Sequence, residues 1–300
     1  MYFIQTNDVE LTSIARNRSD TDMAEKVLKV GQPRLLDLYS KYDVESTFFF
    51  TGDIIEAEPE LLDITRDRGH EIACHGYNHD SRKGFDTKSL NSQIEELQSC
   101  KKIFSKLGYG SIKSFKSPEL RINMDTPKAL EKTGFQVDCS VSSQRFDGPF
   151  SYGTQFKKNW MFAPRKPYFM DIDNPFKRGS SRVFEIPISS FVAPYIGTFM
   201  RIQPKLFSYF EKGLFQESKI TGKPLVFIFH PNECIAETRV TRNMIDKGSA
   251  GYFRDKIRQD LKMKNLGYNA IKLMEKSLRR AKANGFEFIS AIKYKQKIKR

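Results

Sequence analysis

Two histidines, His75 and His79, stand four residues apart in the stretch EIACHGYNHD, just after a short apolar run. Near the N-terminus, Asp8 and Glu10 follow a similar run. Two neutral imidazoles and one carboxylate are a ligand set that suits a catalytic divalent metal ion, with a further position left open for water. These four side chains therefore predict a site for a catalytic metal ion.

Asp8 and Glu10 can serve the same site in different ways. Side chains two residues apart on a strand point to the same side. One carboxylate can hold the metal ion while the other receives the proton of the bound water. Direct coordination of one of them gives the two groups the different environments that distinct roles require.

Each of these patterns also has a structural explanation. Histidines four apart are more often surface residues than ligands, and an Asp-x-Glu segment is commonly a polar loop. A single histidine before proline, such as His230, is more often a structural residue. We expect His70 to be structural, because it lies at the start of its apolar run and not at the end. The order of elements along the chain has to decide between these alternatives.

Short apolar runs alternate with amphipathic stretches along the chain. Most of the runs are nearly continuous and bounded by Gly or Pro, as expected for strands that are covered on both faces. The predicted strands are Tyr2–Thr6, Glu45–Phe50, Glu71–Cys74, Ile112–Lys116, Phe135–Asp138, Val183–Ile188, Leu225–Phe229 and Phe286–Ile292. The predicted helices are Pro59–Arg68, Ser89–Leu107 and Asp125–Lys132, with a last helix that carries Ile271 and Leu278 and ends at Asn284.

Repeated strand–helix alternation favours an α/β fold with a parallel sheet. About eight strands over this length predict a barrel or a distorted barrel. We expect one domain over residues 1–292 and a basic tail over 293–300, with long loops at 141–182 and 231–253 that form walls of a cleft. In a parallel barrel the functional side chains gather at the C-terminal ends of the strands, where all the polar residues above except His70 fall.

The composition limits the class of protein. A hydrophobic content of 39% with 25 Phe and 12 Tyr is typical of a globular protein. The sequence has no apolar run of the roughly 20 residues that a membrane-spanning helix needs. The start MYFIQTNDVE lacks the features of a signal peptide, and the four cysteines show no CxxC spacing. These features favour a cytoplasmic protein with reduced thiols.

The net charge of +14 is concentrated near the C-terminus. Residues 251–300 hold 15 basic and 4 acidic side chains, so they carry +11 of it. Such a run is most often a solvated face. The alternative is peripheral contact with an anionic membrane at the inner membrane face, where each Lys contributes about 1 kcal/mol. We expect no nucleic acid partner, because no recognition motif accompanies the charge.

The chain resembles the polysaccharide deacetylase family, the NodB-like proteins of carbohydrate esterase family 4. The resemblance rests on five ordered segments, TNDVE, HGYNHD, SFKSPELRI, FQVDCSV and VFIFHP, together with NGFEFISAI near the end. It implies a distorted (β/α) barrel of seven to eight strands. It also implies a hydrolase that removes N-acetyl groups from amino sugars with the help of a metal ion.

The resemblance also implies roles for individual residues. Asp8 matches the general base, and His75 and His79 match the metal-binding histidines. His230 matches the general acid, and Asp138 matches the carboxylate that orients and tunes that acid.

Two positions depart from the usual pattern of the family. Val9 follows the base where many members have a ligating Asp, so we assign Glu10 as the third ligand. Lys116 stands where the family usually has Arg paired with the base, and lysine lacks the planar, two-pronged grip of arginine on a carboxylate. Arg121 could assist in orienting Asp8.

The expected reaction uses one divalent ion. Zinc is the first choice, with Co²⁺, Ni²⁺, Fe²⁺ or Mn²⁺ as alternatives. The expected substrate is an N-acetylated carbohydrate, either a polymer or a lipid- or nucleotide-linked precursor. Candidate substrate-binding residues are Pro118, Trp160 and Tyr168, with Phe162 and Phe169 nearby, although loop packing explains these aromatic residues equally well. Two alternatives stay open: a deformylase or other hydrolase of an amide on a lipid-linked amino sugar, and a non-catalytic glycan-binding module.

Overall fold

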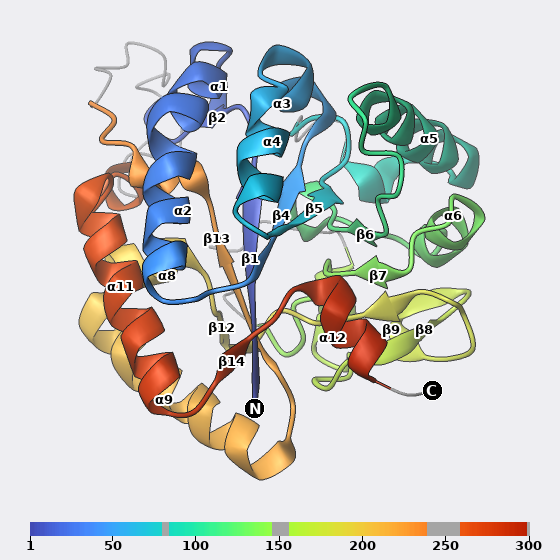
Figure 1. Ribbon diagram of the computed structural model, residues 1–300. Helices are drawn as coiled ribbons and strands as arrows, with labels where there is room; N and C mark the ends of the chain where they lie inside the picture. Colours follow the sequence, from blue (N-terminus) through green and yellow to red (C-terminus); the bar gives the residue numbers. More distant parts are fainter. Residues whose placement is uncertain (80–83, 146–155, 239–258, 299–300) are drawn as a thin grey trace, which may run out of the picture.

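A strongly curled, mostly parallel sheet forms the centre of the computed structural model, which describes residues 1–79, 84–145, 156–238 and 259–298. The strand order is β13-β1-β4-β5-β6-β7-β10-β8-β9, with β14 beside β1 (Figure 1). Neighbours from β13 to β10 run parallel, whereas β8 and β9 run antiparallel to their neighbours. This half-barrel confirms the distorted (β/α) barrel predicted from the sequence.

The strands of this sheet are β1 (Tyr2–Val9), β4 (Ser46–Phe50), β5 (Glu71–Cys74), β6 (Ser114–Phe115), β7 (Val137–Asp138), β8 (Tyr168–Asp171), β9 (Asn174–Arg178), β10 (Phe184–Glu185), β13 (Leu225–Phe229) and β14 (Glu287–Phe288). Two small hairpins stand apart from it, β2 (Thr12–Ser13) with β3 (Arg18–Ser19) and β11 (Ser190–Phe191) with β12 (Ala193–Pro194).

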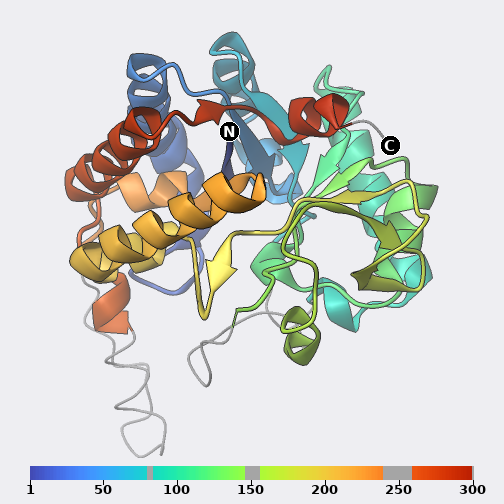
Figure 2. The same ribbon diagram turned by 90° about the horizontal axis from the view of Figure 1, so that it is seen from below.

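Helices surround the curled sheet, as the view from below shows (Figure 2). The longer ones are α2 (Gln32–Lys41), α4 (Glu60–Asp67), α5 (Leu90–Lys106), α6 (Thr126–Lys132), α9 (Pro204–Thr221), α11 (Tyr268–Ala283) and α12 (Ala291–Lys297). The shorter ones are α1 (Asp22–Lys26), η1 (Val27–Gly31), α3 (Gly52–Ala57), η3 (Phe85–Thr87), η4 (Pro118–Leu120), α7 (Lys157–Trp160), α8 (Gly197–Ile202) and η6 (Pro231–Cys234).

Two buried clusters of side chains hold the sheet, one on each face. On β4, Phe48 and Phe50 belong to the cluster under the helices, whereas Phe49 belongs to the inner one. Because consecutive strand residues point to opposite faces, a strand covered on both faces must be apolar throughout. This is why the strands could be recognised as continuous apolar runs.

The curled sheet is closed by single hydrogen bonds and not by a continuous ladder. After β10 the chain passes beside β13, where the Ser189 N–H donates to the carbonyl of Val226 over 3.1 Å. The Ile228 N–H donates to the carbonyl of Tyr195 over 3.2 Å. The strand β13 is thereby flanked on both sides, and the residue that follows it, His230, lies among the other strand ends.

The structure confirms all eight predicted strands, although β6, β7, β10 and β14 are shorter than expected. It also confirms the predicted helices as α4, α5, α6 and α11. Helices over residues 22–41 and 204–221 were not predicted, and the loop expected at 141–182 contains α7, β8 and β9. The loop expected at 231–253 begins with η6, and its residues 239–253 lie outside the described part of the chain.

The last strand prediction, to Ile292, was wrong at its end. The strand stops at Phe288, and helix α12 begins at Ala291, so most of the expected basic tail is helical. The Tyr294 side chain is only 5% exposed and meets the Tyr2 ring edge-on at 5.7 Å. Burial of this aromatic ring on the inner cluster explains why the basic residues around it form a helix against the sheet.

No helix within the described ranges is long and apolar enough to cross a bilayer. Cys74, Cys100, Cys139 and Cys234 are buried free thiols.

We predict that Tyr294→Ala destabilises the fold by about 3 kcal/mol, because it leaves a cavity where a large aromatic ring was buried. Tyr209→Ala is the matched control, since the Tyr209 side chain is 71% exposed. Urea unfolding of both variants measures the difference. Equal midpoints would show that α12 does not contribute to the core.

Candidate active site

Strand β1 carries Asp8 to the C-terminal edge of the sheet, where Lys116 meets it. The Lys116 Nζ lies 2.6 Å from Asp8 Oδ1 and 2.8 Å from Thr6 Oγ1, and it sits over the Phe49 ring at 4.4 Å from the centroid. Both charged groups are buried. Because lysine has three donors, it can bind these two oxygens and still contact the ring.

Asp8 is held in its ionised form. Burial raises the pKa of its carboxyl group, but the charges of Lys116, His75 and His230 and the hydrogen bond from Lys116 outweigh it, so the pKa lies below its usual value. A buried carboxylate that stays ionised can accept a proton at neutral pH. Val9, one residue later, is buried in the outer cluster, whereas Glu10 points back into the site.

His75 follows β5 and presents its Nε2 to both carboxylates. That nitrogen lies 3.8 Å from Asp8 Oδ2 and 4.0 Å from Glu10 Oε2. The other ring nitrogen, Nδ1, lies 2.8 Å from the carbonyl oxygen of Lys116. A carbonyl can only accept, so Nδ1 carries the hydrogen and Nε2 has a free lone pair. Burial lowers the pKa of His75, which favours the neutral imidazole that binds metals.

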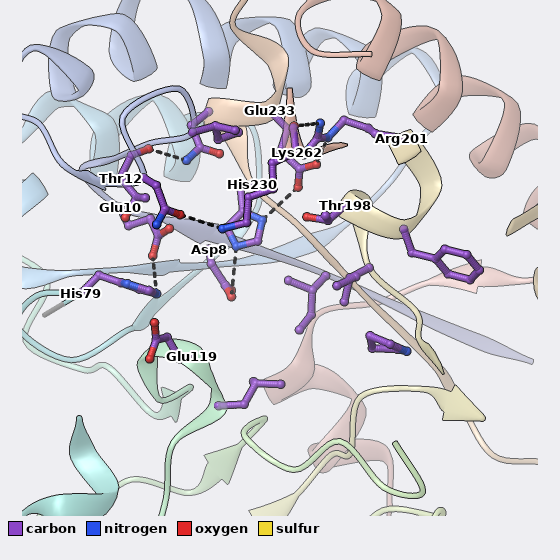
Figure 3. A pocket seen from close by; sticks show the side chains of 18 of the residues that line it. Asp8, Glu10, Thr12, His79, Glu119, Thr198, Arg201, His230, Glu233 and Lys262 are labelled. Atoms are coloured by element: carbon purple, nitrogen blue, oxygen red, sulfur yellow. Dashed lines mark hydrogen bonds and ion pairs between the residues drawn. The ribbon is translucent and has the colours of Figure 1, made fainter. Parts of the chain in front are cut away.

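His79 and Glu10 complete the donor set. The His79 Nε2 lies 3.3 Å from Glu10 Oε2 (Figure 3). This Glu10 oxygen is buried and makes no hydrogen bond within the described residues. An unsatisfied buried carboxylate oxygen facing two imidazole nitrogens fits a divalent cation in chemical terms. Within the described residues, however, no group of three such side chains is already closed around a metal position.

His230 follows β13, and its Nε2 lies 4.0 Å from Asp8 Oδ2. Its Nδ1 lies 3.0 Å from Glu233 Oε1. Burial lowers the pKa of His230, but the hydrogen bond and charge of Glu233, with the charges of Glu10 and Asp8, raise it to about 9. The imidazole is therefore protonated at neutral pH and can act as an acid.

Glu233 is in turn fixed by Arg201. The Arg201 Nε donates to Glu233 Oε2, and both side chains are buried. One terminal nitrogen of Arg201 donates to the carbonyl oxygens of Lys262 and Lys264, each over 2.7 Å. Burial raises the pKa of Glu233, but the charges of Arg201 and His230 and the hydrogen bonds they donate lower it overall. Glu233 is therefore an anionic partner for His230.

These groups open into a cavity of about 780 Å³. Its lining includes Asp8, Glu10, His75, His79 and His230, and its walls come from the loops after the strands and from α8. The loop after β6 contributes Glu119 and Leu120, which have φ angles of 55° and 58°. Two successive side-chain-bearing residues in the left-handed region are strained, as is common where a loop forms a functional site.

The expectation that Asp138 orients His230 was wrong in this structure, because Glu233 occupies that position. Asp138 accepts instead from the Cys139 N–H over 2.9 Å and from Ser140 Oγ over 2.5 Å. The sequence did contain a signal for Glu233. His230 and Glu233 are three residues apart in HPNE, and residues at i and i+3 lie on the same side of a 3₁₀ turn such as η6.

The predicted substrate-binding residues do not line the cavity. Trp160 and Tyr168 are each 1% exposed and pack in the hydrophobic core, so the expectation that they stack on sugars was wrong. Pro118 begins η4, and its neighbours Glu119 and Leu120 line the cavity instead. The Nε of Arg121, the residue expected to assist in orienting Asp8, donates to Asp86 over 2.7 Å.

His70 has the structural role expected for it. It lies at the start of β5, with Nδ1 3.2 Å from Ser46 Oγ and its ring 5.3 Å from that of Phe48. Burial lowers its pKa to about 4.

Comparisons with known proteins agree with this geometry. Residues 22–137 match the family model of polysaccharide deacetylases. A peptidoglycan deacetylase from Helicobacter pylori is 30% identical over 119 residues, which cover 39% of this chain and 39% of that protein. The first relatives found are thus matched over about two fifths of their length or less.

Solved structures show the same fold at low identity. A Mycobacterium smegmatis protein assigned to the polysaccharide deacetylases superimposes with a TM-score of 0.55 at 17% identity, covering 94% of this chain and 92% of that one. A pseudoenzyme of carbohydrate esterase family 4 from Bacillus anthracis gives a TM-score of 0.50 at 12% identity, covering 97% and 64%. The family model, the sequence relatives and the fold all match this chain to the polysaccharide deacetylase family, the first two over about two fifths of its length.

Proposed function

We propose that this protein hydrolyses the N-acetyl group of an amino sugar in a glycan. The observation that carries the proposal is the setting of Asp8. Its carboxylate is bound by Lys116 on one side and faces His75 and His230 on the other, at the floor of a cavity. Hydrolysis of an amide needs a base for water and an acid for the leaving nitrogen, and both lie here within 4.0 Å of each other.

Glu10, His75 and His79 would hold the metal ion. A divalent cation there supplies an electrophile that polarises the amide carbonyl and makes water more acidic. The neutral His75 imidazole, with its free Nε2, is ready to bind a cation without losing a proton. The choice of zinc over other divalent ions stays a prediction.

Asp8 takes the proton of the attacking water as the bond to the acetyl carbon forms. Lys116 keeps this carboxylate ionised before the reaction and fixes the oxygen Oδ1, so Oδ2 faces the site. The buried surroundings leave few competing hydrogen-bond partners for that second oxygen.

His230 then gives its proton to the nitrogen of the departing amine. Glu233 orients the imidazole through Nδ1, so the Nε2 proton points to the cavity. The carbon–nitrogen bond breaks as the nitrogen is protonated, and acetate and the free amino sugar are released. Arg201 keeps Glu233 in place throughout.

The substrate class follows from the cavity and the relatives. A cavity of about 780 Å³ has room for a sugar ring and its neighbour. The peptidoglycan deacetylases among the relatives support a glycan similar to peptidoglycan as the substrate, either as a polymer or as a precursor. A cytoplasmic location and contact of the C-terminus with an anionic membrane stay predictions. Part of that charge is already paired within the fold, for example Lys293 with Glu45 at 2.7 Å.

A non-catalytic glycan-binding module is the second candidate, because the family includes pseudoenzymes. The pairing of Asp8 with Lys116 and of His230 with Glu233 favours the enzyme. A module that only binds glycan has no need for a buried ionised base next to a protonated acid. A different acyl group, such as formyl, would use the same residues.

The test of the proposal is acetate release from a panel of N-acetylated sugars, glycan fragments and precursors by the metal-loaded protein. We expect release from at least one of them and a fall of about 10²–10⁴-fold in Asp8→Asn, which loses the base but keeps the shape. Release of another acid, such as formate, would keep the chemistry and change the substrate. No hydrolysis of any member, with glycan still bound, would favour the binding module.

A second prediction concerns the metal ligands. We expect about one divalent ion per chain, and its loss in the double variant His75→Ala/His79→Ala, because two of three protein ligands are removed. Glu10→Gln should weaken binding, whereas Val9→Ala should not. Metal analysis and titration with Zn²⁺ provide the measurement. Full metal content in the double variant would contradict the ligand assignment.

A third prediction concerns Glu233. Replacing it by Gln removes a charge that raises the pKa of His230 from its usual value to about 9. The protonated fraction of His230 is then lost at lower pH, so the basic limb of kcat/KM should move to lower pH. The control is Glu217→Gln, because Glu217 pairs with Arg165 and Lys223 away from the cavity. An unmoved basic limb in Glu233→Gln would show that His230 is not the acid.

A further inference from the structure

The peptide group between Lys116 and Ser117 is hydrogen-bonded on both of its sides. Its carbonyl oxygen accepts from His75 Nδ1 over 2.8 Å, and its N–H, on Ser117, donates to Ser140 Oγ over 2.8 Å. The residues concerned, His75, Ser117 and Ser140, are buried. A single rigid amide therefore joins the histidine after β5 to the serine after β7.

The Ser140 hydroxyl continues this chain to Asp138. Because the hydroxyl oxygen accepts from Ser117, its hydrogen is free to donate to Asp138 Oδ1, 2.5 Å away. The same Asp138 oxygen also accepts from the Cys139 N–H over 2.9 Å. Every donor from His75 onward thus points toward one buried carboxylate. Hydrogen bonds aligned in this way polarise one another.

Glu185 lies next to Asp138 in the sheet. The two residues are direct partners in the parallel pairing of β7 and β10, and both are fully buried. Each carboxyl group therefore affects the pKa of the other. Within the described residues, Asp138 Oδ2 and Glu185 Oε2 have no hydrogen-bond partner.

Glu185 is the more readily protonated of the two carboxyl groups. Burial, and then the charge of Asp138, raises the pKa of Glu185 well above its usual value, whereas burial raises that of Asp138 only to about 6. The other oxygen of Glu185 accepts from the Val141 N–H over 3.0 Å. At neutral pH, Asp138 is therefore an anion that receives hydrogen bonds from Ser140 and Cys139 and lies beside the neutral Glu185 carboxyl group.

We propose that the Asp138–Glu185 pair is a positioning site for His75, acting through Ser140 and the peptide group between Lys116 and Ser117. The negative charge at Asp138 aligns the hydrogen bonds between His75 and Asp138, so that each donor points toward Asp138. This holds the His75 hydrogen on Nδ1 and makes Nε2 a stronger donor to a cation. Metal-binding histidines commonly have a carboxylate behind them, and here one peptide and one hydroxyl stand in between. The proposal rests on the assignment of His75 as a metal ligand.

The Zn²⁺ affinity of the full-length protein, measured by competition with a chromophoric chelator, tests the proposal. We expect Asp138→Asn to weaken binding about 10–100-fold, the usual effect of losing a group behind a metal ligand. Ser140→Ala, which cuts the chain but keeps the charge, should also weaken it. Glu185→Gln keeps a neutral group beside Asp138 and should bind Zn²⁺ like the parent.

Ser142→Ala is the matched control for Ser140→Ala. The Ser142 hydroxyl is also buried, but it makes no hydrogen bond within the described residues. We therefore expect no change in Zn²⁺ affinity. Circular dichroism and urea unfolding identify any variant that does not fold. If Asp138→Asn does not fold, the Zn²⁺ affinity of Ser140→Ala decides the test.

Nitrogen-15 NMR of the histidine side chains in metal-free protein gives a second measurement, independent of metal and of activity. In the parent, His75 should be the tautomer with its hydrogen on Nδ1, and Asp138→Asn and Ser140→Ala should shift its Nδ1 resonance. The His230 resonances should move in Glu233→Gln and stay unchanged in Asp138→Asn. Folded Asp138→Asn and Ser140→Ala variants with parent-like His75 resonances and Zn²⁺ affinity would overturn the proposal. A parent that binds no Zn²⁺ would instead refute the metal site, and the NMR result would still decide the positioning role.

Discussion

The buried ion pair between Lys116 and Asp8 is the interaction on which the site depends. Two charges taken out of water are costly unless each is paired and hydrogen-bonded, and removing one leaves the other uncompensated. Strands β1 and β6 are separated in the sheet by β4 and β5, so their ends meet only because the sheet is strongly curled. The 2.6 Å contact between Lys116 Nζ and Asp8 Oδ1 at the open end of the barrel therefore depends on the shape of the barrel. Thr6 and the Phe49 ring occupy the remaining contacts of the ammonium group, which leaves the lysine little freedom.

Lys116 serves the site through its backbone as well as through its side chain. Its Nζ binds the carboxylate of Asp8, while its carbonyl oxygen sets the tautomer of His75. On the other side of the cavity, Arg201 and Glu233 keep His230 protonated, whereas His75 is neutral. Asp8 has a lowered pKa and His230 a raised one, and their opposite charges, 4.0 Å apart, contribute to both shifts. Two neighbouring groups driven to opposite protonation states are the arrangement that a base and an acid need.

Much of this arrangement could be predicted from the sequence, because it follows from local rules. Continuous apolar runs marked β1, β4, β5 and β13, and the period of two along β1 predicted Asp8 and Glu10 on the same side. The structure has them so, with Val9 between them in the core. Because parallel strands end at one edge, His75 and His230 were expected together, and they are. Capping residues and Gly stops gave the limits of α4 to α6, where local preference and burial agree.

The predictions that failed share a different cause. Each concerns a residue or helix whose position depends on contacts that local sequence patterns do not contain. Asp138 ends a strand next to the site, but its partners come from β10 and from the following turn, so His230 is oriented by Glu233 instead. Trp160 and Tyr168 lie in a segment rich in Pro and Gly that suggested an open loop, yet both rings pack into the core. The helix α9 was not predicted, because Gly213 and polar residues interrupt its apolar face. Packing against the sheet and α11 stabilises this helix.

The most direct test of the account is the acidic limb of kcat/KM in Lys116→Met. This substitution keeps the length of the side chain and removes the charge that favours the ionised form of Asp8, so the pKa of Asp8 should rise. The limb, which reports the free enzyme, should then move to higher pH, and Lys116→Arg should leave it close to the position in the parent. Activity in Lys116→Met with an acidic limb at the same pH as in the parent would contradict the claim that this ion pair sets the protonation state of the base.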